Sequence, residues 1–448
     1  MMSKYLYGAS VQGIQEFIFK TNTLKEIVGA SELVKQISKK FEAYSADEVL
    51  VNAAGNIKAI FNSQETCQRV VLEFSKEIEQ FAYGITISQA VVSFEGKYTQ
   101  KDMNKLIENL KVQRNRPSLP LDMSLNLMKL NPSTAKPLVN RDSDRATQQK
   151  LAAFKKVEQD PTYKDLKNLS NSKNKLAVIH IDGNGLGNIV KKLSSSKLAL
   201  FSKNLEIATK EAFKIAKKDK EVRDIILGGD DVTLICNADD ALSFTKEFLE
   251  NFEGQTEKTL DQKITACAGI AYSNEKYPFH YGVAVADALC GEAKKHSDRK
   301  ASCLMFHNIQ SSNFVSWEKF VEDELTIVND SDTIRLDFGA YYIDKKEEAS
   351  VEKLIIAVES YRCDGSPISR LRNWLSELYK SKKYSEDLLS RINDVTAQSG
   401  KWNCKIMENN LKNLYSPLDN ENLIVPKDGH DKTPIYDILQ ILSATEVK

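Results

Sequence analysis

The segment Arg223–Cys236 reads RDIILGGDDVTLIC. Two short β-rich runs flank a turn of glycine and aspartate, which predicts a β-hairpin. Gly228 and Gly229 allow the tight turn and leave room for a triphosphate against the backbone. Asp230 and Asp231 place two adjacent carboxylates at the tip, and burying them without a cation would be unfavourable. The hairpin therefore predicts a divalent-cation site, whereas for the turn taken alone an exposed Gly/Asp loop is the alternative.

The residues around the hairpin predict a β-α-β-β-α-β order. LAVIHID (176–182) predicts a central strand, and a helical pattern runs over about 197–218. After the hairpin, residues 242–252 have helical spacing, and 263–273 predict another strand. A helix over 283–296 and a short strand at 305–306 complete the segment. This order is the ferredoxin-like arrangement, in which two helices cover one face of an antiparallel sheet.

A third acid belongs to the same predicted site. Asp182 ends the first strand, which lies beside the hairpin strands in this topology. Three converging carboxylates can hold two Mg²⁺ or Mn²⁺ ions, with the Gly183 backbone carbonyl as a further ligand. We therefore predict Asp182, Asp230 and Asp231 as the catalytic and metal-binding residues of a two-metal phosphoryl or nucleotidyl transfer.

The turn after Asp182 is predicted to bind phosphate. Three of its five residues are glycine and it enters a helix, so backbone N–H groups can face a phosphate. Asn184 has two open roles: it orients a phosphate or sugar, or it adopts the left-handed turn conformation. Lys294 lies on the 283–296 helix, where a solvated face is the alternative. The predicted nucleotide- and phosphate-binding residues are Gly183, Asn184, Gly185, Leu186, Gly187, Gly228, Gly229 and Lys294.

The sequence indicates no chemistry for two histidine positions. His180 lies within the predicted central strand, where a histidine is more often a core residue than a ligand. His430 and Asp431 spell the HD dipeptide of metal phosphohydrolases but lack suitably spaced partners.

The first hundred residues repeat the same order of elements. VLVNAAGNIKAIF (49–61) occupies the place of the hairpin, with AAGN where the later copy has GGDD. YGITISQAVVSFEG (83–96) corresponds to the strand at 263–273. Chance similarity of two such patterns is the alternative. Because the first copy has lost the acids, catalysis is assigned to the second, and the first is a nucleotide-binding or structural partner.

We therefore predict an α+β protein with two ferredoxin-like palm domains and a C-terminal, mainly helical domain. The connector between the palms is proline-rich, because four of the ten prolines lie in 114–145. The predicted boundaries are 1–113 for the degenerate first palm, 114–170 for a partly helical connector, 171–310 for the GGDD palm and 311–448 for the C-terminal domain.

Composition restricts the class of protein. Lys+Arg and Asp+Glu both number 62, so the net charge is zero, which argues against a general polyanion-coating protein. Seven cysteines form no CxxC pair, as expected for reduced thiols. No stretch approaches the roughly 18 apolar residues of a membrane span. We expect a soluble, cytoplasmic protein with no membrane partner.

The motifs resemble a known family. ID-GNGLG (181–187), LGGDD (227–231), AGIA (268–271) and ADALCGEAKK (286–295) are similar to the GGDEF-related palm in the large polymerase-like subunit of type III CRISPR effector complexes. The opening SVQGIQEFIF resembles that subunit's first, degenerate palm. The likeness covers about 4–96 and 174–307. The A-D-x(5)-A-K motif is shared with diguanylate cyclases and favours Lys294 as a phosphate-facing lysine.

The resemblance implies an activity. In that family two palms bind two ATP molecules, and the GGDD palm joins them into cyclic oligoadenylates, second messengers of antiviral defence. Partners would be other CRISPR effector subunits with guide and target RNA, or a second copy of the chain. No HD nuclease domain or inter-palm zinc cysteines are present, which favours a shortened or stand-alone relative. A largely structural subunit and a GTP-using diguanylate-type cyclase are the alternatives, and the sequence fixes neither the product nor the activating signal.

Overall fold

The computed structural model describes residues 3–21, 23–53, 55–116, 127–157, 169–193, 195–310, 316–329, 332–399 and 404–446. The chain divides into two compact units. The first contains residues 1–168, 185–207 and 225–229, and the second contains 169–184, 208–224 and 230–448.

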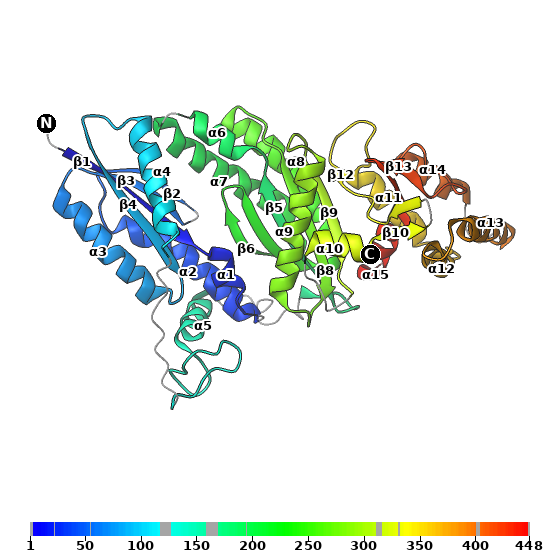
Figure 1. Cartoon of the computed structure of the whole chain (residues 1–448), viewed down its shortest axis with the longest axis horizontal. Helices are drawn as coiled ribbons and strands as arrows, with labels where there is room; N and C mark the ends of the chain where they lie inside the picture. The colour runs from blue at the N-terminus through cyan, green and yellow to red at the C-terminus, as the bar shows by residue number, and fades with distance from the viewer. Residues whose placement is uncertain are drawn as a thin grey trace. The chain divides into compact units, whose positions relative to one another are not determined.

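The first unit is built on a four-stranded antiparallel sheet with the order β2-β3-β1-β4 (Figure 1). Its elements are β1 (Ser3–Gln12), α1 (Ile14–Phe19), α2 (Leu24–Glu42), β2 (Glu48–Ala53), β3 (Asn56–Phe61), α3 (Gln64–Phe81), β4 (Thr86–Glu95) and α4 (Gln100–Arg114). The central strand β1 is buried on both faces, which its apolar sequence predicts. Leu6 packs in a core with Met103 and Leu106 of α4, whereas the ring of Tyr7 stacks on Phe41 of α2. Because successive side chains of a strand point to opposite faces, α4 and α2 cover opposite sides of this sheet.

The connector contains one helix in its described part, α5 (Arg145–Val157). Two isolated β-bridges precede it, Leu130 with Pro137 and Leu138 with Asp144. Lys150 of α5 is buried and its ammonium donates a hydrogen bond to the carbonyl of Phe17 at 2.6 Å. Residues 117–126 and 158–168 of the predicted connector lie outside the described residues.

The GGDD segment lies in a six-stranded sheet with the order β12-β9-β8-β5-β7-β6. The strands are β5 (Lys175–Gly183), β6 (Val222–Gly228), β7 (Asp231–Asn237), β8 (Ala266–Asn274), β9 (Cys303–Asn308) and β12 (Tyr341–Tyr342). The helices are α6 (Leu186–Lys192), α7 (Ser195–Lys217), α8 (Ala241–Leu260) and α9 (Phe279–His296). The order β6-β7-β5-β8 repeats β2-β3-β1-β4, which confirms the two ferredoxin-like palms predicted from the sequence. A helix follows the last strand in both copies, since α9 follows β8 as α4 follows β4.

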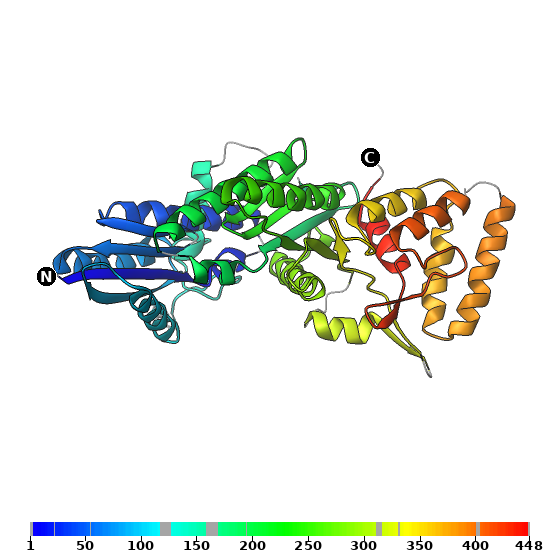
Figure 2. The same cartoon turned by 90° about the horizontal axis from the view of Figure 1, so that it is seen from above.

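Helix α9 packs very closely on the sheet because β8 has a glycine beneath it. A Cβ added to Gly269 would lie 2.0 Å from the backbone oxygen of Ala286 and 2.6 Å from the nitrogen of Cys290. Gly282, one turn earlier, faces Val178 of β5. Residues 178, 180 and 182 share one face of β5, so α9 lies over the face that carries Asp182. Figure 2 shows α9 on one side of the sheet and α7 and α8 on the other.

The C-terminal part is mainly helical, as predicted. Its helices are α10 (Trp317–Glu324), α11 (Val351–Tyr361), α12 (Ile368–Leu378), α13 (Lys382–Ser399), α14 (Cys404–Leu414) and α15 (Ile435–Ala444). It also contains a small sheet that the sequence did not predict, in the order β10-β11-β14-β13. Its strands are β10 (Thr326–Asn329), β11 (Asp332–Arg335), β13 (Val425–Lys427) and β14 (His430–Lys432). Among the described residues no helix is long and apolar enough to cross a membrane.

The apolar run at residues 335–343 does not form one continuous strand. β11 ends at Arg335 and β12 begins at Tyr341. Between them the guanidinium of Arg335 donates two hydrogen bonds to Asp337, at 2.7 and 2.6 Å. The N–H of Phe338 donates to the carboxylate of Asp437 on α15 at 3.2 Å. These hydrogen bonds go to side chains and not to a neighbouring strand, so β11 and β12 remain separate.

Candidate functional site

The second palm brings Asp182 and Asp231 together at the end of β5. The two residues are directly paired in the antiparallel register of β5 and β7. Cross-strand partners have Cβ atoms about 5 Å apart, so their carboxylates share one small region. Asp230 occupies the turn immediately before β7, after Gly229, whose φ of 63° lies in the left-handed region. The predicted convergence of the first strand with the hairpin is therefore present in the geometry of the sheet.

Lys294 of α9 points into this group of acids. Its ammonium donates hydrogen bonds to Oδ2 of Asp182 and, at 3.0 Å, to the backbone oxygen of Gly183. The Lys294 side chain is 8% exposed and that of Asp182 is 40% exposed. A buried ammonium needs such partners, because a charge removed from water without them is costly. Lys294 thus contacts the two groups that the sequence predicts as metal ligands.

The acids are electrostatically crowded. Burial, followed by the charge of Asp182, raises the pKa of Asp230 from 3.8 to about 6. The pKa of Asp231 is also raised, mainly by burial and by Asp182, while His180 opposes the rise. A raised carboxyl pKa means that the surroundings disfavour the negative charge. The cluster would therefore gain free energy from an added cation.

The residues fit a cation that also binds substrate phosphates. Oδ1 of Asp231 is buried and accepts no hydrogen bond, and a bound cation would satisfy this oxygen. In the described part of the chain, no group of three or more His, Cys, Asp or Glu side chains is arranged to hold a metal ion by itself. Mg²⁺ needs no such group, because it is usually held by one or two carboxylates together with substrate phosphates and water.

The glycines around the acids leave their backbone open. A Cβ added to Gly185, Gly187 or Gly229 would meet no atom within 4 Å. Gly185 has a φ of 71° and forms the N-cap of α6, which begins at Leu186. The left-handed position of the turn is therefore Gly185 and not Asn184, which corrects one of the two roles considered for Asn184.

Asn184 is buried beneath the turn. Its backbone N–H donates to the carbonyl of Thr265 at 2.8 Å. Its side-chain amide nitrogen donates to the Thr265 hydroxyl at 3.0 Å, while its Oδ1 is buried without a partner. These contacts tie the turn after Asp182 to the start of β8, so Asn184 supports the backbone that carries Gly183.

Two residues near the acids, His180 and Asp287, were not predicted as site residues from the sequence. His180 is buried on the same face as Asp182, and its Nε2 lies 3.3 Å from Oδ1 of Asp287. Its Nδ1 is hydrogen-bonded with the hydroxyl of Thr233 at 3.1 Å and lies 3.7 Å from Oδ1 of Asp231. His180 was assigned to the core, and Asp287 was noted only as a motif position. A polar residue at period 2 from Asp182 on a central strand was the available signal.

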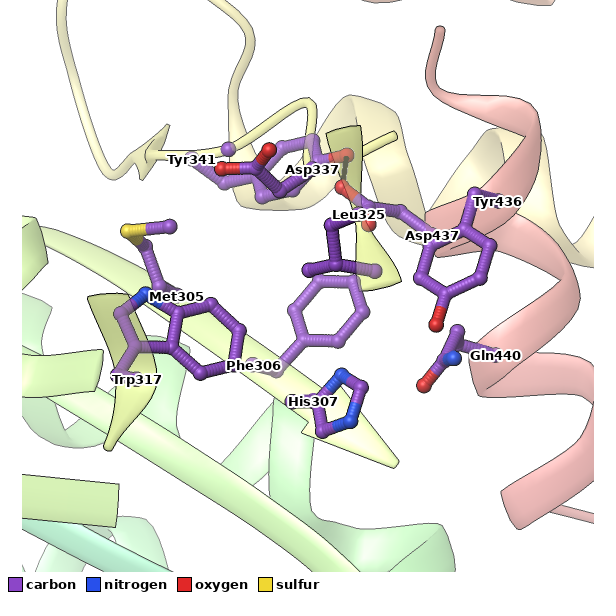
Figure 3. A pocket seen from close by; sticks show the side chains of 11 residues that line it. Met305, Phe306, His307, Trp317, Leu325, Asp337, Tyr341, Tyr436, Asp437 and Gln440 are labelled. Atoms are coloured by element: carbon purple, nitrogen blue, oxygen red, sulfur yellow. Dashed lines mark hydrogen bonds between the residues drawn. The ribbon is translucent and has the colours of Figure 1, made fainter. Parts of the chain in front are cut away.

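A small cavity lies elsewhere in the same unit, and none of the acids above lines it. Its volume is about 10 Å³, and its polar lining includes His307, Tyr341, Asp437 and Gln440 (Figure 3). The phenol of Tyr341 donates to Asp437 at 2.7 Å, and the two side chains point toward one another in Figure 3. A space of this size holds at most one water molecule. The cavity is too small for a nucleotide.

A ferredoxin-like sheet with one acid at the end of its first strand and two at the central hairpin defines a polymerase/cyclase-type palm. Residues 175–303 match the family model described as "Cas10/Cmr2, second palm domain". This segment of the chain is therefore similar to the second palm domain of Cas10-like proteins.

Solved structures of Csm1–Csm4 complexes share the fold. One Csm1–Csm4 cassette in complex with cA3 matches with a TM-score of 0.57 at 15% identity, covering 99% of this chain and 70% of that chain. The cassette in complex with cA4 matches with a TM-score of 0.56 at 15% identity and the same coverage. Another, in complex with pppApA, matches with a TM-score of 0.55 at 15% identity. At these identities the likeness establishes the fold.

The chain is shorter than these relatives. It spans 54% of the matched chain in the Csm1–Csm4 cassette in complex with AMPPNP. No curated protein matches the chain by sequence.

Proposed function

We propose that the second palm joins ATP molecules through 3′–5′ bonds and releases a cyclic oligoadenylate-type product. The observation that carries this proposal is the pairing of Asp182 with Asp231 in register, next to Asp230, with the buried ammonium of Lys294 against Asp182. Four similarly folded Csm1–Csm4 cassettes are complexes with cA4, cA3, pppApApA and pppApA. These complexes support adenylate as the substrate class.

The proposed reaction is a nucleotidyl transfer. The 3′-hydroxyl oxygen of one ATP attacks the α-phosphorus of a second, the bond to the β-phosphate oxygen breaks, and pyrophosphate leaves. The hydroxyl proton passes to solvent. Asp182, Asp230, Asp231 and the carbonyl of Gly183 would hold two Mg²⁺ or Mn²⁺ ions, which neutralise the triphosphate and lower the pKa of the attacking hydroxyl. Lys294 adds positive charge beside the phosphates, and the open glycine backbones at 185–187 and 228–229 let them approach.

The direct test is incubation of the purified chain with radiolabelled ATP and Mn²⁺, followed by separation of the products. We expect cyclic or linear oligoadenylates from the wild type and none from Asp230→Ala/Asp231→Ala. Asn56→Ala is the matched control, because Asn56 occupies the equivalent hairpin of the first palm. Equal product from the double variant and the wild type would refute the site. A nucleotide panel distinguishes ATP from GTP and so tests the diguanylate-type alternative.

A second candidate function is a scaffold within an RNA-guided complex. It is favoured by the Csm1–Csm4 structures, in which the similarly folded subunit is bound to a partner. Purification of the tagged chain from its native cells, with sequencing of bound RNA, tests this function. Recovery of other effector subunits together with a guide RNA, and no oligoadenylate synthesis by the assembled complex, would favour the scaffold over the enzyme.

A further inference from the structure

His180 lies between two carboxylates from different elements. Its ring is 5% exposed, with Nε2 at 3.3 Å from Oδ1 of Asp287 on α9 and Nδ1 at 3.7 Å from Oδ1 of Asp231 on β7. Nδ1 is also hydrogen-bonded with the hydroxyl of Thr233 at 3.1 Å. If the Thr233 hydroxyl donates to Nδ1, the Nε2 position carries the hydrogen and faces Asp287. Both ring nitrogens therefore have polar neighbours within the protein.

The sheet register and one glycine create this arrangement. His180 pairs with Thr233 on β7 and with Gly269 on β8. Since Gly269 has no side chain, α9 approaches the sheet at this level, and Asp287 comes within reach of the His180 ring. Lys294 lies two helical turns further along α9 and contacts Asp182, two residues after His180. The same helix is thus attached to β5 at two points.

The first palm provides an internal comparison. Gly13 and Gly185 are both left-handed N-caps at the end of the first strand, so Ser10 corresponds to Asp182 and Gly8 to His180. Ser10 pairs with Asn56 as Asp182 pairs with Asp231. A Cβ added to Gly8 would lie 2.9 Å from the side chain of Leu106 on α4. In the first palm, the position equivalent to His180 is therefore Gly8, which faces the apolar side chain of Leu106.

We propose that His180 is a positioning residue of the metal site, holding the Asp231 carboxylate toward the cation and fixing α9 through Asp287. The proposal rests on the proposed function of the acids. His180 is not a catalytic residue, because its ring is almost fully buried and both nitrogens face side chains of the protein. Its ring packs behind Oδ1 of Asp231 at 3.7 Å, which is too long for a hydrogen bond, so it fixes the place of this oxygen and leaves it available to a cation. A histidine placed behind a carboxylate ligand in this way tunes metal affinity.

The test measures Mn²⁺ binding directly, from the electron paramagnetic resonance signal of free Mn²⁺, without any turnover. Loss of such a supporting residue typically weakens metal affinity about 10- to 100-fold. We expect that loss for His180→Leu, and partial recovery for His180→Gln, whose amide nitrogen can reach Asp287. His307→Leu is the matched control, because His307 is also buried in this sheet but packs against Trp317 and Phe320. It should bind Mn²⁺ as the wild type does.

Unchanged Mn²⁺ affinity in folded His180→Leu would overturn the proposal, and so would equal weakening in His307→Leu. If His180→Leu does not fold, Thr233→Val replaces it, since this variant removes one hydrogen-bond partner of the ring and keeps the histidine. Thr233→Val should also weaken Mn²⁺ binding. Unchanged Mn²⁺ affinity in this variant would overturn the proposal. If the wild type binds Mn²⁺ through Asp231 but makes no product, the proposed function fails while the positioning role stands. A wild type that binds no Mn²⁺ with or without ATP overturns both.

Discussion

Replacing Gly269 with alanine should separate α9 from the sheet. The new Cβ would lie 2.0 Å from the Ala286 oxygen, a backbone atom that cannot rotate away. Restoring an ordinary contact of about 3.4 Å requires a shift of roughly 1.4 Å in α9 or β8. Overpacking of this kind costs about 1–3 kcal/mol, and the upper end applies because both elements are backbone-constrained. For a unit of this size, about 3 kcal/mol corresponds to a fall in Tm of roughly 6–12 °C.

The same shift would disturb the candidate site. Lys294 and Asp287 are both on α9, so a displacement of more than about 1 Å separates them from Asp182 and His180. Differential scanning calorimetry and Mn²⁺ binding should therefore both report the substitution. Gly291→Ala is the matched control on the same helix, because an added Cβ there meets no atom within 4 Å. It should stabilise the protein by about 0.5–1 kcal/mol. A Gly269→Ala protein that melts within about 2 °C of the wild type and binds Mn²⁺ normally would refute the close-packing argument.

Three further outcomes follow from the charges. Burial raises the pKa of Asp437 from 3.8 to about 7, so the folded chain keeps a proton that the unfolded chain loses between about pH 4 and 7, and stability falls as pH rises through that range. The free energy of unfolding should change by on the order of 4 kcal/mol over this range. Asp437→Asn should flatten this part of the Tm–pH curve, and an unchanged slope would contradict the prediction. Added Mn²⁺ should raise the Tm of the wild type by relieving the crowded acids, but not that of Asp230→Ala/Asp231→Ala, and equal shifts would argue against a cation at the hairpin. Lys294→Met should lower product formation by about 10²-fold, because it removes a positive charge beside the phosphates. It should not weaken Mn²⁺ binding, because the Lys294 ammonium contacts the same oxygens as the proposed cation. Weaker Mn²⁺ binding would instead make Lys294 part of the metal site.

The sequence was sufficient for the sheet that carries the acids. Five of its six strands are six to nine residues long, so their periodicity and order could be predicted. The convergence of Asp182 with the hairpin acids then followed from the topology, whereas the register that pairs Asp182 with Asp231 is a result of the structure. The strands of the small C-terminal sheet are three or four residues long, too short for alternation to be recognised. β11 and β14 pair in parallel across about a hundred residues, which no local pattern indicates.

The contact between His180 and Asp287 could not have been predicted in the same way. It depends on three features together: the register of β5 with β8, the absence of a side chain at Gly269, and a rotation of α9 that brings Oδ1 of the exposed Asp287 within 3.3 Å of the His180 ring. Each is a packing result, and a one-residue change of register would turn His180 to the other face. The motif therefore identified Asp287 as unusual without identifying its partner.

Comparing the two palms shows how the acids affect stability and why the second palm has them. In the first palm, the Ser10 hydroxyl is hydrogen-bonded to Asn56 at 3.3 Å, a neutral pair that needs no counter-charge. At the equivalent position the second palm has Asp182 and Asp231, and burial together with the charge of Asp182 raises the pKa of Asp231. The same strand pairing can therefore be built with or without the charges, so folding does not require them. Residues that break a local rule without serving the fold are expected at functional sites. The cost in stability is thus concentrated where a cation and a triphosphate would remove it, which is the physical reason to place the chemistry in the second palm.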